Sequence, residues 1–265
     1  MQEEEWHEHE EEPRFRAVEE IGPTELYEGL CALAGLSGNP FLAMQAQQLC
    51  MVDNVLMSME QTVLREMLDD DPPTGQRTLL AALSPMWIYA AYELLRTWRQ
   101  RAVEVVRLAE NGGIDMRAKH LEKKLGYTHY DRELRAQQLR DAKGNPALVQ
   151  RMRDDLARTE IGFTMLEFIR IALAKHEVAS SNKKKKPIAF APGLATINRH
   201  CGSMEYEVSV GGAIIQYETR RGLAEMMRQF PGMPVPTLEE LADFQAYMNP
   251  PDVDAVNDDL PGGMG

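Results

Sequence analysis

The run NPFLAMQAQQLCMVDNVLMSMEQTVLREML, residues 39–68, decides the fold class of this chain. Its apolar residues recur at spacings of three and four, which is the period of one face of an α-helix. Asn39 is a good N-cap, and Pro40 suits the first helical position because it lacks the N–H group that would stay unbonded there. The sequence DDDPPTG, residues 69–75, ends the pattern. The inward-facing stripe of this long helix is predicted to be Leu49, Val52, Leu56, Met59, Val63 and Met67.

Two further stretches predict long helices. Residues 84–111 begin with a Ser-Pro pair, a typical helix start, and end at an Asn-Gly-Gly run. Residues 145–180 begin with Asn-Pro, and Gly162 inside them predicts a kink, because glycine costs about 1 kcal/mol in a helix interior. Between them, residues 115–143 predict shorter basic helices broken at Gly126. The expected fold is therefore mostly α, a bundle of three long helices.

A different pattern follows residue 180. Residues 204–217 alternate apolar and polar side chains around Gly211-Gly212, the signature of a β-hairpin with a two-residue turn. A short helix is expected at 219–229 and another at 237–248. The predicted register pairs Val210 with Ala213, Val208 with Ile215, Tyr206 with Tyr217 and Glu205 with Glu218. The fold thus gains a small C-terminal β-hairpin.

The composition also predicts a domain organisation, with an acidic, disordered tail at each end of the chain. The segments expected along the chain are an acidic mobile arm (1–36), a helical bundle domain (37–181), a basic and then Pro/Gly-rich loop (182–203), a hairpin with a short helix (204–230) and an acidic tail (231–265). A chain of 265 residues can bury a core without disulfides or metal. This length excludes the stapled mini-protein classes.

The cysteines and the N-terminal sequence predict the cellular compartment of the protein. The three cysteines, Cys31, Cys50 and Cys201, are an odd and widely spaced set, which favours a reducing compartment over a secreted disulfide framework. The N-terminal sequence MQEEEWHEHEEE has neither a basic nor an apolar region, and no run reaches the roughly 20 apolar residues of a membrane span. We expect a cytoplasmic protein without a membrane partner.

The net charge of -12 conceals an uneven distribution. Residues 1–20 and 232–265 each sum to -7, whereas residues 117–186 carry 17 bases against nine acids. This basic stretch can face a polyanion such as RNA. The alternative is an ordinary solvated helix face whose arginines and lysines pair with acids one turn away.

Common enzyme motifs are absent: the chain has no Gly-rich phosphate loop, no GxSxG, no HExxH and no Cys/His metal spacing. His7 and His9 lie among glutamates of the acidic arm, and nothing near in sequence orients Cys201 and His200 as a nucleophilic pair. We therefore expect no metal and no cofactor.

The segment FIRIALAKHEVASSNKKKK, residues 168–186, holds the candidate site. Arg170, five intervening residues and His176 at the end of a long helix resemble the motif of the HEPN superfamily, over roughly residues 40–180. Ile171 follows the arginine where that family often has Asn, Asp or His. The resemblance implies an RNA-directed protein, commonly a metal-independent endoribonuclease of toxin or defence type, in which a homodimer shares the active cleft; some members only bind RNA or nucleotides. The lysines predicted to bind RNA are Lys175, Lys183, Lys184, Lys185 and Lys186.

The chemistry of the two motif residues follows from their types. Arginine can hold a phosphate bidentately, and an imidazole that titrates near neutral pH can move the proton of a 2′-hydroxyl, which leaves a 2′,3′-cyclic phosphate and a 5′-hydroxyl. Six residues of helix give a net rotation of about 240° and a rise of about 9 Å, so Arg170 and His176 do not share a face. They can converge where the helix frays before His176, or where two chains each supply one group.

A structural interpretation stays open beside the catalytic one. Leu166, Ile169, Leu173 and His176 follow at helical spacings, so that His176 can end an apolar stripe while Arg170 pairs with Glu167. The protein would then be a non-enzymatic helical module that binds a protein partner or antitoxin through an apolar groove, or a nucleic-acid-binding HEPN-like protein that has lost catalysis.

Arg96 and Arg99 also allow two interpretations, a nucleic-acid-binding surface or packing in the core. They interleave with Tyr92 and Trp98, and such an arrangement can stack nucleobases. These aromatic residues also lie on the predicted apolar stripe of their helix, which favours packing in the core.

Overall fold

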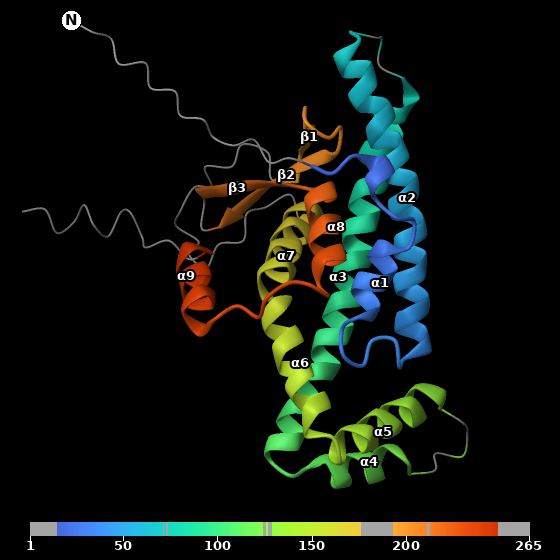
Figure 1. The fold of residues 1–265 in the computed structure, drawn as a ribbon, viewed down its shortest axis with the longest axis vertical. Helices are drawn as coiled ribbons and strands as arrows, with labels where there is room; N and C mark the ends of the chain where they lie inside the picture. Colours follow the sequence, from blue (N-terminus) through green and yellow to red (C-terminus); the bar gives the residue numbers. More distant parts are fainter. Residues whose placement is uncertain are drawn as a thin grey trace, which may run out of the picture.

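A computed structural model describes residues 15–70, 72, 74–123, 126, 129–175, 193–210 and 213–248. These residues form a mostly α-helical fold with a small antiparallel sheet, which confirms the predicted fold class (Figure 1). The acidic segments 1–14 and 249–265, predicted to be disordered, lie outside the described residues.

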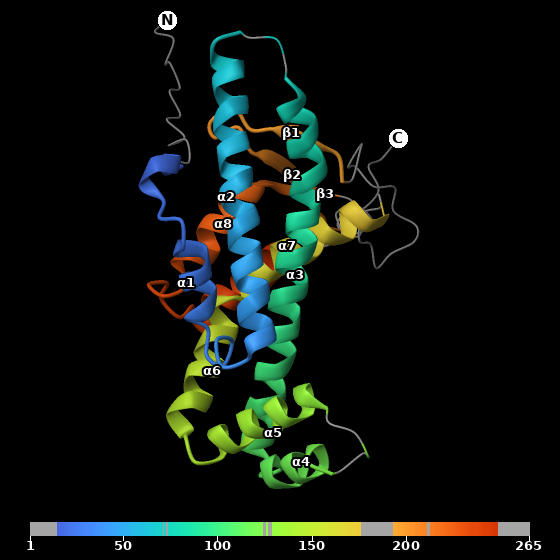
Figure 2. The same cartoon turned by 90° about the vertical axis from the view of Figure 1, so that its right-hand side faces the viewer.

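Two long antiparallel helices, α2 (Pro40–Leu68) and α3 (Gly75–Glu110), lie side by side along the molecule (Figure 2). The start of α2 is as predicted, because the side chain of Asn39 accepts hydrogen bonds from the N–H groups of Phe41 and Leu42. The predicted start of the second helix at residue 84 is wrong. The helix begins at Gly75 with Thr74 as its N-cap, and it continues through Pro85 because Leu80, Trp87 and Ile88 are buried on both sides of the proline.

The predicted third helix is two helices, α6 (Pro146–Arg158) and α7 (Glu160–Lys175), separated at Thr159. The hydroxyl of buried Thr159 donates to the carbonyl of Asp155, and its oxygen accepts from Arg99. Gly162 lies after this break and does not cause it. A Cβ at Gly162 would overlap the sulfur of Met226, so the glycine lets the following C-terminal helix approach α7. The shorter basic helices expected between residues 115 and 143 are α4 (Ile114–Leu121) and α5 (Tyr130–Lys143).

The sheet has the order β1-β2-β3, with β1 (Ala195–Ile197), β2 (Met204–Val210) and β3 (Ala213–Thr219). The predicted hairpin is confirmed, and β1 lies in the segment 182–203 that was predicted to be a loop. Residues 211 and 212, the turn itself, lie outside the described residues.

The predicted hairpin register holds only next to the turn. Val210 pairs with Ala213 as predicted, but Val208 pairs with Gln216 instead of Ile215, because a β-bulge lies between Val208 and Ser209 on β2 and leaves Ile215 as the extra residue on β3. Beyond the bulge every pair is shifted by one. Tyr206 therefore faces Glu218, and Glu205 faces Thr219, so the predicted Tyr206–Tyr217 and Glu205–Glu218 pairs are wrong.

The N-terminal segment also differs from its prediction. Of the predicted mobile arm, residues 15–36 are described, and they contain a 3-10 turn, η1 (Val18–Glu20), and helix α1 (Glu25–Cys31). Four leucines of this segment are buried in the core: Leu26, Leu30, Leu33 and Leu36. The prediction is wrong for this part because its leucines pack against residues far away in the sequence.

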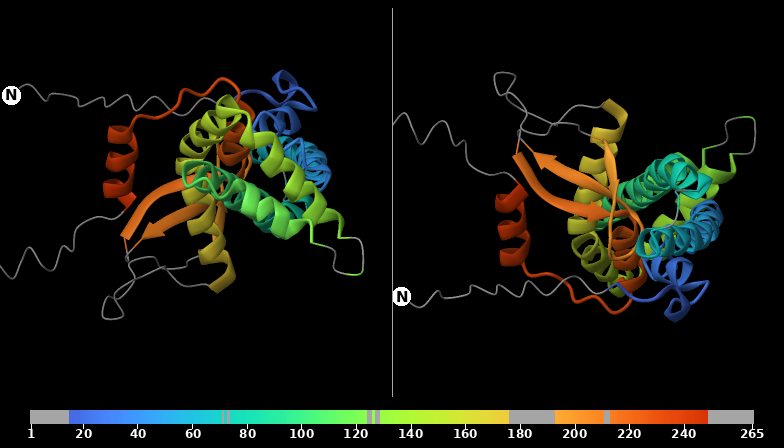
Figure 3. Two further views of the ribbon diagram at one scale, coloured as in Figure 1. Left: turned by 90° about the horizontal axis from the view of Figure 1, so that it is seen from below. Right: turned by 90° about the horizontal axis from the view of Figure 1, so that it is seen from above.

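The C-terminal helices are α8 (Arg220–Gln229) and α9 (Leu238–Met248), close to their predicted ranges. Helix α8 packs on α1, and α9 lies near β3 on the opposite side of the molecule from α2 (Figure 3). Tyr206, Leu223 and Met227 join the same core as Leu56 and Trp87. The predicted segments 37–181 and 204–230 therefore share one hydrophobic core.

In the described part of the chain, α3 is the one helix long and apolar enough to cross a membrane, by length and composition alone. Its inward face supplies much of the core, including Trp87, Ile88, Leu95 and Trp98. The predicted absence of a membrane partner stays a prediction.

Candidate functional site

Arg170 lies on α7 and reaches toward α3. Its guanidinium carbon is 4.8 Å from the centroid of the Tyr92 ring, which is a cation–π contact. Tyr92 is buried and Arg170 is half-buried. The arginine of the predicted motif is therefore held by an aromatic ring of the neighbouring helix.

This contact is one end of a stack of four side chains between α3 and α7. The rings of Tyr92 and Phe163 are stacked with centroids 5.3 Å apart and an angle of 11° between their planes. Phe163 in turn contacts Arg99, whose guanidinium carbon is 4.8 Å from the centroid of the Phe163 ring. We call Arg99, Phe163, Tyr92 and Arg170 the cation–π stack. Each of its two guanidinium groups lies against a different ring of the aromatic pair.

The two arginines of the cation–π stack differ in their polar partners. Arg99 donates to the carbonyl of Leu156 at 2.9 Å and to the hydroxyl of Thr159, and it forms an ion pair with Glu160. Arg170 forms no ion pair and no hydrogen bond with another described residue. Glu167, its predicted partner, instead accepts a hydrogen bond from the Tyr92 hydroxyl at 3.1 Å. Burial and this carboxylate raise the pKa of Tyr92, so the phenol stays neutral.

Arg170 is therefore held against Tyr92, and no other described residue bonds its guanidinium donors. A guanidinium group that stacks on an aromatic ring can still direct its N–H groups toward an anion. The other half-buried or buried arginines in the described part are bonded to carboxylates or to backbone carbonyls, as Arg132 is to His120 and Leu121. Arg170 is the described arginine best prepared to bind a phosphate.

Of the remaining predicted site residues, the structure describes Lys175. Lys175 is the last residue of α7, while His176 and the four lysines at 183–186 lie outside the described residues. Their predicted roles stay predictions.

The helix-packing interpretation of Arg96 and Arg99 is confirmed. Trp98 is buried and its indole N–H donates to the carbonyl of Ala34 at 3.0 Å. Arg96 forms an ion pair with Glu93, so it makes no stacking surface with Trp98.

The positive charge of the basic stretch is largely neutralised in the described residues. Arg117 and Arg135 both pair with Glu104, and Lys143 pairs with Asp115. Further pairs join Arg140 to Glu122, Arg153 to Glu110 and Arg158 to Asp155. Because Glu104, Glu110 and Asp115 precede the stretch in sequence, its local excess of charge overstates the field that a polyanion would meet.

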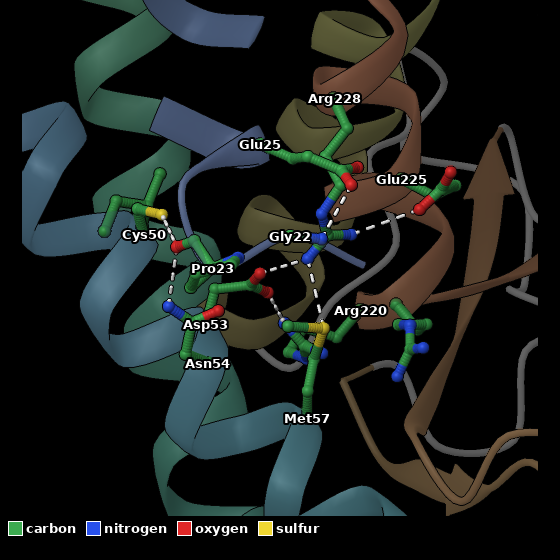
Figure 4. Close-up of polar contacts among 12 residues, drawn as sticks. Gly22, Pro23, Glu25, Cys50, Asp53, Asn54, Met57, Arg220, Glu225 and Arg228 are labelled. Atoms are coloured by element: carbon green, nitrogen blue, oxygen red, sulfur yellow. Dashed lines mark hydrogen bonds and ion pairs between the residues drawn. The ribbon is translucent and has the colours of Figure 1, made fainter. Parts of the chain in front are cut away.

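Sequence reasoning missed a second cluster of charges, which is buried between α2 and α8. Arg220, fully buried, donates to both carboxylate oxygens of Glu60 at 2.6 and 2.7 Å and also bonds Asp53. Arg228 bonds the other oxygen of Asp53, and Figure 4 shows it between Asp53 and Glu225. Burial alone would lower the pKa of Arg220, but Glu60 and Asp53 outweigh this effect and raise it.

This buried cluster fixes α8 against α2, because its carboxylates and guanidinium groups bind one another. Its signal in the sequence was the pair Asp53 and Glu60, two acids seven residues apart on the apolar face of α2. Buried charges need partners, so their position indicated cations elsewhere in the chain. Cys201 lies near Glu60, and burial raises the pKa of its thiol to about 12, which does not favour a reactive thiolate.

Among the described residues, no group of three or more His, Cys, Asp or Glu side chains is arranged to hold a metal ion. Comparisons of the chain with protein-family models, with curated proteins and with solved structures found no match. The resemblance to the HEPN superfamily therefore depends on the Arg170–His176 motif and the helical layout alone.

Proposed function

We propose that this protein is an RNA-directed, HEPN-like protein that binds the phosphate backbone through Arg170 and cleaves RNA without a metal. One observation supports the proposal above the others: Arg170 is stacked on Tyr92 and has no carboxylate partner among the described residues. An arginine held in this way pays little conformational entropy when it binds a phosphate bidentately.

In the proposed reaction Arg170 binds the scissile phosphate and neutralises charge that builds up in the transition state. His176 accepts the proton of the 2′-hydroxyl, whose oxygen attacks phosphorus, and a proton returns to the departing 5′-oxygen. The products are a 2′,3′-cyclic phosphate and a 5′-hydroxyl. The resemblance implies that a second chain completes the cleft.

The test is cleavage of a panel of RNAs by the full chain in EDTA at neutral pH. Arg170→Ala and His176→Ala should each abolish cleavage, and the double variant should be no worse than either, because residues that act as a unit are not additive. Arg170→Ala should also weaken RNA binding about tenfold or more, as expected for the loss of a charge-assisted bond. Arg107→Ala, which removes an exposed arginine without a described ion pair, is the matched control.

Each outcome is informative. RNA binding that depends on Arg170 without any cleavage would assign the protein to the non-catalytic form of the proposal. Wild-type protein that neither binds nor cuts the RNAs at micromolar concentration would contradict both forms. A lower melting temperature for His176→Ala, with no activity to lose, would favour the structural role of that histidine.

A further inference from the structure

The outer surface of α2 is unusual for a chain with a net charge of -12. Between Phe41 and Leu64 its only charged residues are Asp53 and Glu60, and both are fully buried in their ion pairs with α8. The exposed positions of this part of α2 are apolar or neutral polar: Phe41, Met44, Gln45, Gln47, Gln48, Met51, Val52, Val55 and Ser58.

The neighbouring part of α3 continues this surface. From Thr78 to Tyr92 it contains no charged residue, and Leu79 and Met86 are exposed. Figure 2 shows α2 and α3 side by side, with the sheet behind their upper halves. We call these exposed positions of α2 (41–64) and α3 (78–92) the uncharged face.

The apolar members of the uncharged face are too exposed to belong to the core. Met44 is 49% exposed, Met51 63%, Val55 56% and Met86 65%. Val52, predicted to face inward, is 42% exposed. Monomeric proteins rarely expose contiguous apolar patches of more than a few hundred Å², and larger ones mark interaction sites.

We propose that the uncharged face is the interface of a homodimer, in which the same face of a second copy packs against it across a two-fold axis. The charge distribution selects this occupant. Two chains of charge -12 repel each other overall, whereas this face meets its own copy without bringing like charges together. A two-fold interface is built from one self-complementary patch, which a neutral apolar face provides.

The uncharged face is large enough to form the interface of a homodimer. At about 1.5 Å per residue, the 24 residues from Phe41 to Leu64 extend about 36 Å along α2. With helices about 10 Å wide and the shorter strip on α3, the face covers about 600 Å². A symmetric pair would bury about 1,200 Å² in total, above the roughly 1,000 Å² that a specific interface needs.

This interface differs from the shared cleft that the resemblance implies, and it can be tested separately from the proposed RNA chemistry. Arg170 lies on α7, which packs against α3, and its contact is with Tyr92 at the border between those helices. The uncharged face does not include Arg170. Failure of RNA cleavage would therefore leave the dimer proposal intact, and a monomeric protein would leave phosphate binding by Arg170 intact.

The experiment measures the mass of the full chain by light scattering and sedimentation equilibrium over micromolar concentrations. Wild type should be a dimer, and Met51→Glu and Val55→Glu should each raise the dissociation constant about a hundredfold, because both copies then bring a buried carboxylate to the interface. Met116→Glu, at a methionine that is 75% exposed on α4, is the matched control and should stay dimeric. Circular dichroism checks that all variants keep their helices.

Three results would overturn the proposal. The first is a monomeric wild type, and the second is a dimer that neither Met51→Glu nor Val55→Glu weakens. The third is a monomer that sediments with lipid vesicles and loses this binding in Met51→Glu, which would assign the face to a membrane surface.

Discussion

Glu218 shows how one shift in register changes the chemistry of a side chain. The bulge in the hairpin places it opposite Tyr206 at the end of β3, where its Oε1 accepts the N–H of Thr219 at 2.8 Å. Burial raises the pKa of its carboxyl to about 7; the Thr219 bond opposes this shift, and the nearby charge of Glu205 adds to it. The two arginines that follow in sequence, Arg220 and Arg221, form ion pairs with Glu60.

Folding should therefore become less favourable as the pH rises from 4.5, the ordinary value for this carboxyl, through about 7, because the folded state holds its proton more tightly than the unfolded state. We predict that Glu218→Gln removes this dependence. Its free energy of unfolding should match that of wild type near pH 4.5 and exceed it by up to about 3 kcal/mol at pH 8. Urea unfolding at both pH values measures the difference.

The control for this prediction is Glu239→Gln, which changes an exposed carboxylate on α9. It should leave the pH profile of wild type unchanged. Parallel profiles for wild type and Glu218→Gln from pH 4.5 to 8 would mean that Glu218 titrates normally.

At the scale of elements, the close packing of α1 on α8 explains how the N-terminal segment joins the fold. Gly29 makes the approach possible: a Cβ there would overlap the carbonyl oxygen of Met227 and lie 2.9 Å from Cα of Arg228. These are backbone atoms, which cannot move aside as a flexible side chain can. Arg16 strengthens the same junction through ion pairs with Glu25 of α1 and Glu225 of α8.

We predict that Gly29→Ala destabilises the protein by about 1 to 3 kcal/mol, the usual cost of overpacking, although alanine favours helix more than glycine does. The melting temperature should fall by several degrees. Gly38→Ala is the matched control, since no atom lies within 4 Å of the Cβ it would add, and its effect should stay within about 0.5 kcal/mol. A Gly29→Ala variant at least as stable as wild type would show that α1 does not pack closely on α8.

At the scale of the whole molecule, the chain has a negative net charge, whereas residues 117–186 carry an excess of positive charge. Residues 1–14 carry seven acids and one arginine, and residues 249–265 carry four acids and no base. Residues 15–248 between them sum to only -2, and several of the bases in the described part are paired with carboxylates. The acidic segments at the two ends of the chain therefore dominate the field that an RNA would meet.

We predict that removing residues 1–14 and 249–265 tightens RNA binding at low salt, and that the gain shrinks above about 0.3 M salt as screening increases. Residues 15–20 are kept because Arg16 holds α1 to α8. Fluorescence anisotropy with a labelled RNA measures the effect. A full-length variant with Gln in place of the seven glutamates of residues 1–14 should also bind RNA more tightly at low salt. Equal affinities of wild type, the truncated protein and this variant would exclude screening by the acidic segments.

The sequence by itself determined what depends on neighbours along the chain. Hydrophobic period and capping chemistry set the bounds of α2, and Gly-Gly between alternating residues set the hairpin and its first pair. These features could be predicted because each rests on backbone preferences within a few residues. For the candidate site, the same local reasoning identified Arg170 but gave it the wrong neighbour, Glu167 in place of Tyr92.

Only the tertiary structure decided the features that join distant residues. It buried the leucines of residues 26–36, carried α3 through Pro85, and paired Arg220 with Asp53 across 167 positions of sequence. It also placed the ring of Tyr92 beneath Arg170, from a helix that begins almost a hundred residues earlier. Burial and ion pairing outweigh local preference in these places, because desolvation and packing energies depend on which surfaces meet in space and not on their order in the chain.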